Sequence, residues 1–180
     1  MSIFEEIRDS ADGRELSERW YRYKVKQVLG TRGSFRGVMG EADARSRGSI
    51  PKWGNMNLFW YRPKTAKKLP YYDMFPMIML IGADKDTFLG INFHYLRPKW
   101  RAILLDRVTA KIGGGLPKWS KLRNIRQIAP TIKRYRFDHI MRKVIPIEED
   151  EQEIAIFLPT ERFKKSGKAK VWSESERKFG

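Results

Sequence analysis

The sequence predicts an α+β domain: a bent five-stranded antiparallel sheet or a small SH3-like barrel, with a helical insertion and basic arms at both ends. Short runs with the alternation or continuous apolarity of strands occur within residues 55–95, and two helical stripes follow within residues 97–129. Hydrophobic residues make up 41% of the 180-residue chain and aromatic residues 13%, which is enough apolar surface for a core.

The first third of the chain predicts a helix followed by a linker. Residues 14–29 place Leu16, Trp20 and Tyr23 at a spacing of three or four, and Gly30 is a natural helix stop. The next 25 residues hold six glycines, three serines and five lysines or arginines. This composition is typical of a basic linker that becomes ordered only on a partner.

Five runs are predicted to be strands, because they alternate or are continuously apolar between turn residues. Gly90, inside the third run, marks either a bulge or a close backbone approach. The runs are NMNLFWY at 55–61, FPMIMLIG at 75–82, TFLGINFHY at 87–95, KVIPI at 143–147 and EIAIFLP at 153–159.

Three helices are predicted between the third and fourth strands. Residues 97–108 and 116–129 each begin near a proline and carry an apolar stripe that starts at a tryptophan, with lysine and arginine between its members. In the first of these, Lys99, Arg101 and Arg107 are expected to face outward. Residues 131–141 are expected to form a third, short helix.

The tail from residue 164 is polar and basic, with two aromatic residues, and is expected to be an arm with too little apolar surface to fold alone. No apolar run reaches the roughly 20 residues that span a membrane, so no membrane partner is expected. The predicted organisation is, in chain order, an N-terminal helix (1–29), a basic linker (30–53), a core (54–163) with its helical insertion (97–141), and a C-terminal arm (164–180).

Charge is the strongest functional signal. Thirty-seven lysines and arginines face 21 acidic residues, giving a net charge of +16. Residues 97–143 hold 14 basic and two acidic residues, a net of +12, whereas residues 144–158 hold five acidic and no basic ones. A localised excess of this size favours a polyanionic partner, and we expect sequence-independent contact with DNA, double-stranded by preference.

The stretch RPKTAKKLPYYD, residues 62–73, raises a more specific question. Its cations lie between two predicted strands, and prolines stiffen both ends, which suits a loop that binds phosphates. Tyr71 and Tyr72 could stack on unpaired bases, or at least one could pack on the core. The candidate nucleic-acid-binding residues are Arg62, Lys64, Lys67, Lys68, Lys99, Arg101, Lys118, Lys121, Arg123, Arg126, Lys133, Arg134 and Arg136.

Enzyme motifs are weak. His94 and His139 lie far apart with no metal-ligand spacing near them, and the chain has no cysteine. The glycines at 113–115 lack the lysine and hydroxyl of a phosphate-binding loop. Four aspartates could in principle hold magnesium in a nuclease, although turn and cap roles explain them better: Asp73, Asp84, Asp86 and Asp106. No catalytic residue, metal ligand or cofactor is therefore predicted.

Several blocks resemble a family of small basic proteins of large contractile-tailed bacteriophages. The corresponding positions are Gly54, Met56, Tyr61, Pro63 and Lys64, then LPYYDMFP at 69–76, FLGINFHYL at 88–96 and FLPTERF at 157–163. The resemblance spans roughly residues 54–172 and departs at Arg97, where the family pattern has a second proline. It implies a virion-associated or DNA-associated phage protein, and implies no reaction.

Three functional hypotheses follow. The first is a non-enzymatic virion structural protein, assembled in the host cytoplasm, that contacts DNA and other virion proteins. The second is a pure assembly component whose cations meet acidic neighbours in the neck, tail or baseplate. The third is a metal-dependent nuclease. Salt-dependent DNA retention separates the first two, and metal-dependent cleavage would establish the third.

Overall fold

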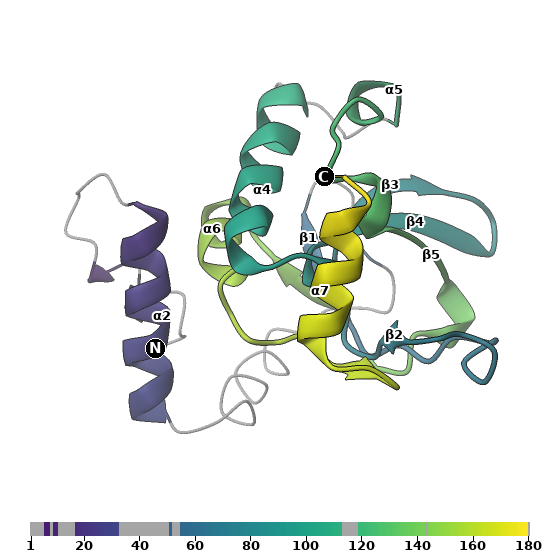
Figure 1. Cartoon of the computed structure of the whole chain (residues 1–180), viewed down its shortest axis with the longest axis horizontal. Coiled ribbons are helices and arrows are strands. Elements are labelled where there is room, and N and C mark those ends of the chain that lie inside the picture. The colour runs from purple at the N-terminus through teal and green to yellow at the C-terminus, as the bar shows by residue number, and fades with distance from the viewer. Residues whose placement is uncertain are drawn as a thin grey trace.

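A computed structural model describes residues 6–7, 9–10, 17–32, 51, 55–112, 119–142 and 144–179 (Figure 1). Most of the linker predicted at 30–53, and the glycine run at 113–115, lie outside these residues. No described helix is both long enough and apolar enough to span a bilayer.

A five-stranded antiparallel sheet forms the centre of the fold, in the order β5-β4-β3-β1-β6. The predicted fold class is confirmed in its open form, because the sheet does not close into a barrel. A separate two-stranded sheet pairs β2 with β7. The strands are β1 (Met56–Leu58), β2 (Tyr72–Asp73), β3 (Met77–Ala83), β4 (Thr87–Asn92), β5 (Ile132–Arg136), β6 (Ile145–Ile147) and β7 (Phe163–Lys164).

The three predicted strands within residues 55–95 are confirmed as β1, β3 and β4. The register of β3 against β4 shifts between Leu80 and Gly82. Gly90 pairs with Leu80, and a Cβ added to Gly90 would lie 2.7 Å from Cδ1 of Ile78. Gly90 therefore marks a close approach to a neighbouring side chain rather than the bulge itself.

Helices lie in front of the sheet and to one side of it, and the β3–β4 turn projects on the other side (Figure 1). The apolar side of α4 buries Leu104, Leu105 and Val108 in the main core. At one end of the molecule α2 lies beside α6, where the Tyr21 ring stacks on Phe157 with centroids 6.3 Å apart. The helices are α2 (Glu18–Arg32), α4 (Pro98–Ile112), α5 (Trp119–Leu122), α6 (Gln152–Ala155) and α7 (Lys168–Arg177), with 3₁₀ turns η1 (Phe93–Tyr95), η2 (Ala129–Thr131), η3 (Phe137–His139) and η4 (Glu149–Glu151).

Two predictions about secondary structure in the second half are wrong. Residues 131–141 form β5 and η3 instead of a helix, because the free edge of β4 pairs with residues 132–136 along their length. Residues 153–159 form α6 and turns instead of a strand. A capping box between Glu148 and Glu151 starts the helical turns there. Because residues 154–158 are all buried, their apolar pattern could not distinguish a helix from a strand. Of the helix predicted at 116–129, the described part is helical only over α5, followed by turns.

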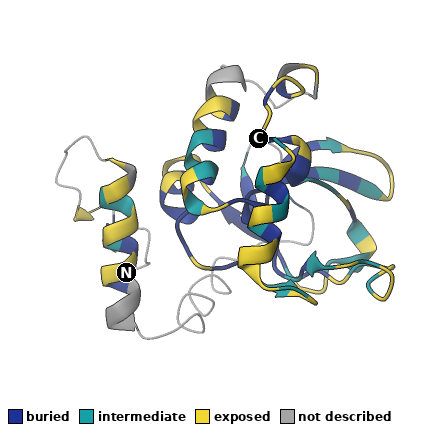
Figure 2. Cartoon of the chain, viewed as in Figure 1, coloured by how far each residue is buried: buried dark blue, intermediate teal, exposed yellow. Residues whose placement is uncertain are grey.

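The prediction of an unfolded C-terminal arm is also wrong. In α7, Val171 and Ser175 are buried, and the Trp172 indole Nε1 donates a 2.9 Å hydrogen bond to the carbonyl of His94 (Figure 2). The helix packs on η1 and η2, so its few apolar side chains are sufficient when the rest of the core is present.

Candidate nucleic-acid interface

Two parts of the chain are candidates for function: a buried polar network and an exposed basic edge. The buried network joins Asp73, His94 and Thr160, one residue from each of three sequence blocks. His94 places Nδ1 2.7 Å from Oδ2 of Asp73 and Nε2 2.9 Å from Oγ1 of Thr160. All three side chains are buried.

Asp73 has further partners. The Asn92 amide donates to Asp73 Oδ2 at 3.1 Å and to the Tyr135 hydroxyl at 3.1 Å, and the backbone amide of Phe75 donates to Asp73 Oδ1 at 3.0 Å. Burial by itself would raise the pKa of Asp73. Interaction with the His94 ring and these hydrogen bonds outweigh burial and hold the pKa below its ordinary value.

A second buried pair adjoins this network. Arg101 is fully buried: its Nε donates to the carbonyl of Leu96 at 2.7 Å, its Nη1 to that of Ile156 at 3.0 Å, and its Nη2 lies 3.4 Å from Glu161 Oε2. The expectation that Arg101 faces outward and binds nucleic acid is therefore wrong. Its guanidinium is a structural group that ties α4 to the loop after α6.

Glu161 is held as a carboxylate by this arrangement. Burial would raise its pKa, but the Arg101 charge, with lesser help from neighbours such as Lys168, holds the pKa below the ordinary value. Lys168 at the start of α7 reaches Glu161 Oε1 at 3.3 Å.

An Asp–His–hydroxyl arrangement resembles a hydrolytic triad in connectivity alone. A nucleophile must reach the scissile bond, and Thr160 is only 1% exposed. The network therefore holds β2, η1 and the 157–163 segment together.

The exposed basic edge begins with the loop at 62–70, which joins the Tyr61 bridge to β2. Four of its side chains are exposed: Arg62, Lys64, Lys67 and Lys68. The loop is turned on itself by backbone hydrogen bonds from Ala66 to Pro63 and from Lys68 and Leu69 to Thr65.

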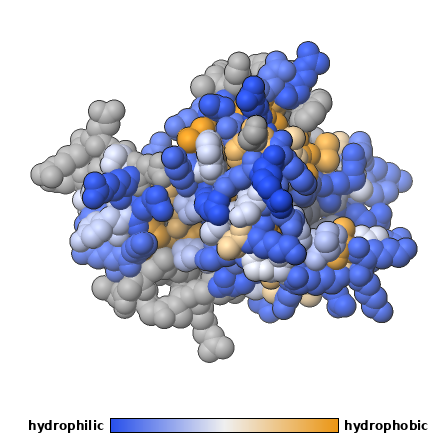
Figure 3. All heavy atoms as spheres, in the orientation of Figure 1, coloured by the Kyte–Doolittle hydropathy of each residue, from blue (hydrophilic) through white to orange (hydrophobic). Residues whose placement is uncertain are grey.

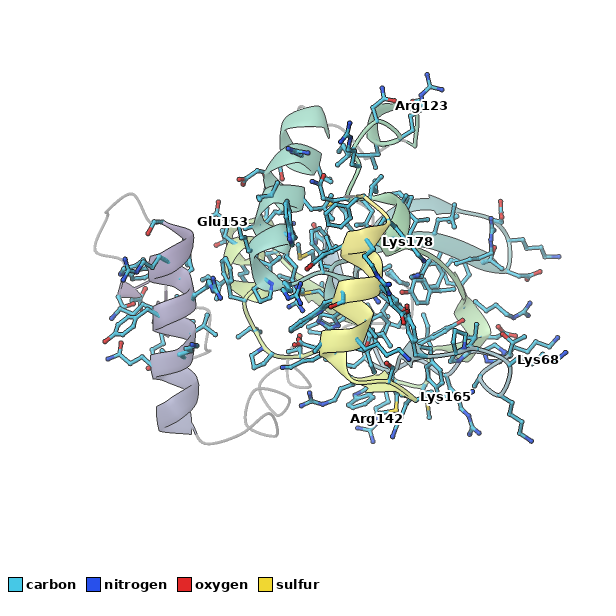
Figure 4. All side chains as sticks on the ribbon, in the orientation of Figure 1. Lys68, Arg123, Arg142, Glu153, Lys165 and Lys178 are labelled. Carbon is cyan, nitrogen blue, oxygen red and sulfur yellow. The ribbon has the colours of Figure 1, made fainter. Side chains whose placement is uncertain are left out.

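Lys165 fixes this loop from the other side. Its ammonium donates to the carbonyls of Ala66, Lys67 and Leu69 at 2.6, 3.0 and 2.8 Å. Lys165 has a φ of 68°, in the left-handed region that side chains rarely adopt, and it directly follows β7. We call residues 62–70 together with Lys164 and Lys165 the basic edge; Figure 4 shows Lys68 and Lys165 at this end of the molecule.

A family model described as phage T4 terminal DNA protecting protein matches residues 5–175. The chain belongs to this family. The phage resemblance seen in the LPYYD and FLPTERF blocks is thereby confirmed. No curated protein and no solved structure matches the chain.

In this member of the terminal DNA protecting protein family, the blocks that carry the resemblance build the interior. Asp73 lies in LPYYDMFP, Asn92 and His94 in FLGINFHYL, and Thr160 and Glu161 in FLPTERF. The most specific sequence blocks of the chain thus contain the buried polar network that stabilises the fold. The exposed cations beside this network are the groups that a partner can reach.

The two tyrosines that follow the loop at 62–70 serve the fold. Tyr71 donates a 2.8 Å hydrogen bond to Glu174 Oε2, and its ring packs near Tyr95 and Phe163. Burial, followed by the interaction with Glu174, raises the pKa of Tyr71 to about 12. Tyr72 lies in β2, half-buried and paired with Lys164. Tyr71 is therefore not a free platform for bases.

The remaining predicted cations do not form one footprint. Figure 4 shows Arg123 by α5 and Lys68 by the basic edge, projecting from different ends of the molecule. Arg134 pairs with Asp84 and Arg136 with Asp138, whereas Lys133 is half-buried. Lys99, Arg123 and Arg126 are exposed, and Lys118 and the side chain of Lys121 lie outside the described residues.

One group of acidic residues lies away from the basic edge. Asp106, Glu149, Asp150 and Glu153 line a hollow between α4 and the η4–α6 segment. Figure 4 shows Glu153 near α2, opposite Lys68, and Figure 3 shows hydrophilic residues over most of the visible face. These four carboxylates therefore lie on a different part of the molecule from the basic edge.

The aspartates considered for a nuclease site do not converge. Asp73 is buried, Asp84 and Asp86 lie exposed at the β3–β4 turn, and Asp106 lies on α4. Across the described ranges, no three histidine, aspartate or glutamate side chains are grouped to hold a metal ion.

Sequence reasoning missed Lys165 as the residue that organises the loop. The only available signal was its place just after FLPTERF, because neither a left-handed backbone nor three carbonyl partners leaves a local pattern in sequence.

Proposed function

We propose that this chain binds terminal duplex DNA in the phage particle and shields it without catalysing a reaction, using the basic edge as its contact surface. The family name supports terminal DNA as the partner. The observation that carries the surface is the loop at 62–70, where four exposed cations stand on a turn whose carbonyls are held by Lys165.

Preorganisation is the physical reason for choosing this surface. A flexible lysine-rich loop loses conformational entropy when it docks on phosphates, whereas a loop held by backbone hydrogen bonds and by the Lys165 ammonium has already lost much of it. Phosphate contacts are also indifferent to base sequence, as a protein that covers a DNA end requires.

The test is a salt titration of DNA affinity. Lys64→Ala, Lys67→Ala and Lys68→Ala together should reduce the slope of log affinity against log salt by up to about 2.7, since each duplex phosphate contact contributes about 0.9. The matched control removes three exposed cations elsewhere: Arg19→Ala, Lys26→Ala and Lys85→Ala. Equal losses in both variants would show that net charge alone binds DNA and would contradict the assignment to the basic edge.

Protection of ends is tested with linear and closed circular duplexes of one sequence. Bound protein should slow exonuclease digestion of the linear form, and the triple lysine variant should protect less. Salt-dependent binding without any protection would instead favour a role in packing or assembly, with acidic neighbours as the rival partners for the same cations. Magnesium-dependent cleavage by the protein itself would favour the nuclease hypothesis.

A further inference from the structure

Lys133 has no carboxylate partner among the residues that the structure describes. It lies on β5, half-buried, with Nζ 4.0 Å from the centroid of the Tyr95 ring. The ring face holds the ammonium in place by a cation–π contact, but it does not neutralise the charge.

A second lysine lies in the same region, because α7 packs on η2, which leads directly into β5, and Lys178 directly follows α7. Burial first, and then repulsion from Lys178 at the end of α7, lower the pKa of Lys133 to about 8. Neither lysine forms an ion pair with any carboxylate in the part of the chain that the structure describes. A partly desolvated cation beside a like charge is destabilising unless an anion completes the site.

Other cations in the same region are treated differently. Arg97 pairs with Glu176 of α7, and Lys168 of α7 pairs with Glu161, so each of these cations has a carboxylate partner. Within the described ranges Lys133 and Lys178 have no such partner, although Glu174 and Glu176 lie on α7.

The position of Lys133 relates it to the basic edge. The Tyr95 ring, which makes the cation–π contact with Lys133, also packs against two other rings. Its centroid lies 5.2 Å from that of Phe163 and 6.2 Å from that of Tyr71. Phe163 directly precedes Lys164 and Lys165, and Tyr71 directly follows the loop at 62–70. An aromatic floor therefore connects Lys133 to the proposed contact surface.

We propose that Lys133 and Lys178 form a seat for a phosphate group of DNA, connected to the basic edge through the aromatic floor. This inference rests on the proposed function and adds a specific phosphate-binding position to it. A phosphate accepting hydrogen bonds from both ammonium groups would replace their repulsion by two charge-assisted contacts. Tyr95 fixes one ammonium, so less freedom is lost on binding.

The direct experiment is an NMR titration of the lysine side chains in the full-length protein. Duplex DNA, or inorganic phosphate alone, should raise the pKa of Lys133 by at least about one unit, because an anion favours the charged form. In Lys178→Met, the free protein should show a higher Lys133 pKa and a weaker response to phosphate. An unchanged Lys133 pKa on saturation with bound DNA would overturn the seat.

Affinity measurements provide the second arm. Lys133→Met keeps the packing of the stem and should lower the salt slope by about 1, as loss of one phosphate contact does. Lys85→Met, at the exposed β3–β4 turn, is the matched control and should change the slope less. Equal slopes for the two variants would overturn the seat even if the triple lysine variant of the basic edge loses affinity.

Three DNA substrates identify the source of the phosphate. If Lys133→Met weakens only linear duplexes with a 5′-phosphate, the seat takes a terminal phosphomonoester. If it weakens 5′-phosphate, 5′-hydroxyl and closed circular forms equally, the seat takes a backbone phosphodiester. Both outcomes support the seat. Should the protein fail to bind DNA at all, the response of Lys133 to inorganic phosphate still decides whether the seat exists.

Discussion

The imidazole Nδ1 of His94 lies 2.7 Å from Oδ2 of Asp73, and both side chains are essentially closed to solvent. This contact joins η1 to β2, two elements whose sequences lie 21 residues apart. Through Thr160 the same imidazole reaches the segment that leads to β7. The buried His94 ring thus connects the segments that flank the basic edge.

Asp73→Asn should be strongly destabilising, because it removes the buried negative charge and leaves His94 with a poorer partner. We expect the free energy of unfolding to fall by about 3 kcal/mol, measured by urea denaturation. Asp86→Asn, at an exposed turn, is the control and should change stability by less than about 0.5 kcal/mol. Similar effects at both positions would contradict a network that holds the fold.

The same pair predicts a dependence on acid. Because the pKa of Asp73 is lowered on folding, its ionised form contributes stability above the ordinary value of 3.8, and that contribution is lost as the pH falls through the folded pKa. The wild-type protein should therefore lose stability below about pH 4 more steeply than Asp73→Asn does, as followed by circular dichroism. Parallel acid-unfolding curves for the two proteins would show that Asp73 contributes nothing to this dependence.

Arg101→Met should damage the fold and leave DNA contact in the folded fraction unchanged. Removing one partner of a buried pair costs about 3–5 kcal/mol, because the Glu161 carboxylate is left with less compensation. Adding Glu161→Leu should recover part of this loss. Lys99→Met, on the exposed face of the same helix, should not lower stability. A variant at Arg101 with full stability and reduced DNA affinity would restore the residue to the contact surface.

Lys165→Met should loosen the basic edge without unfolding the protein. The backbone amides of Lys68 and Leu69 should exchange with solvent faster, since the turn that they close loses the ammonium bound to its carbonyls. DNA affinity should fall more than in Lys164→Met, which removes an equal charge from an exposed neighbour that holds no carbonyls. If the two variants lose the same affinity, charge matters there and preorganisation does not.

Trp172→Ala should detach α7 from the core. The indole packs beside η1 and donates to the His94 carbonyl, so we expect a loss of about 3 kcal/mol, as for other large aromatic side chains. Ser173→Ala, on the exposed side of the helix, is the control. Amide exchange in the free wild-type protein provides a second check: protection over residues 168–177 is expected, and uniformly fast exchange there would mean that the helix is not docked.

The sequence by itself determined the elements that are written locally. β3 is a continuous apolar run that ends near Gly82, and α4 begins at Pro98 and carries a stripe of period 3.6, so both were predictable. The basic loop between strands was also predictable from local sequence, because a run of prolines and lysines favours an exposed turn. The family was also readable, since buried polar residues such as Asp73 and His94 lie inside specific blocks.

Only the tertiary structure decided the features that depend on distant partners. Residues 132–136 form a strand because the edge of β4 has unpaired backbone groups with which they pair. The helix α7 packs on the core because Trp172 donates a hydrogen bond to the His94 carbonyl. Arg101 is an arginine on a basic helix in sequence, and only Glu161, 60 positions later, explains its burial. The physical reason is common to all three: local periodicity records which residues are apolar, whereas the free energy that fixes a polar group comes from a partner that the chain brings close only after it has folded.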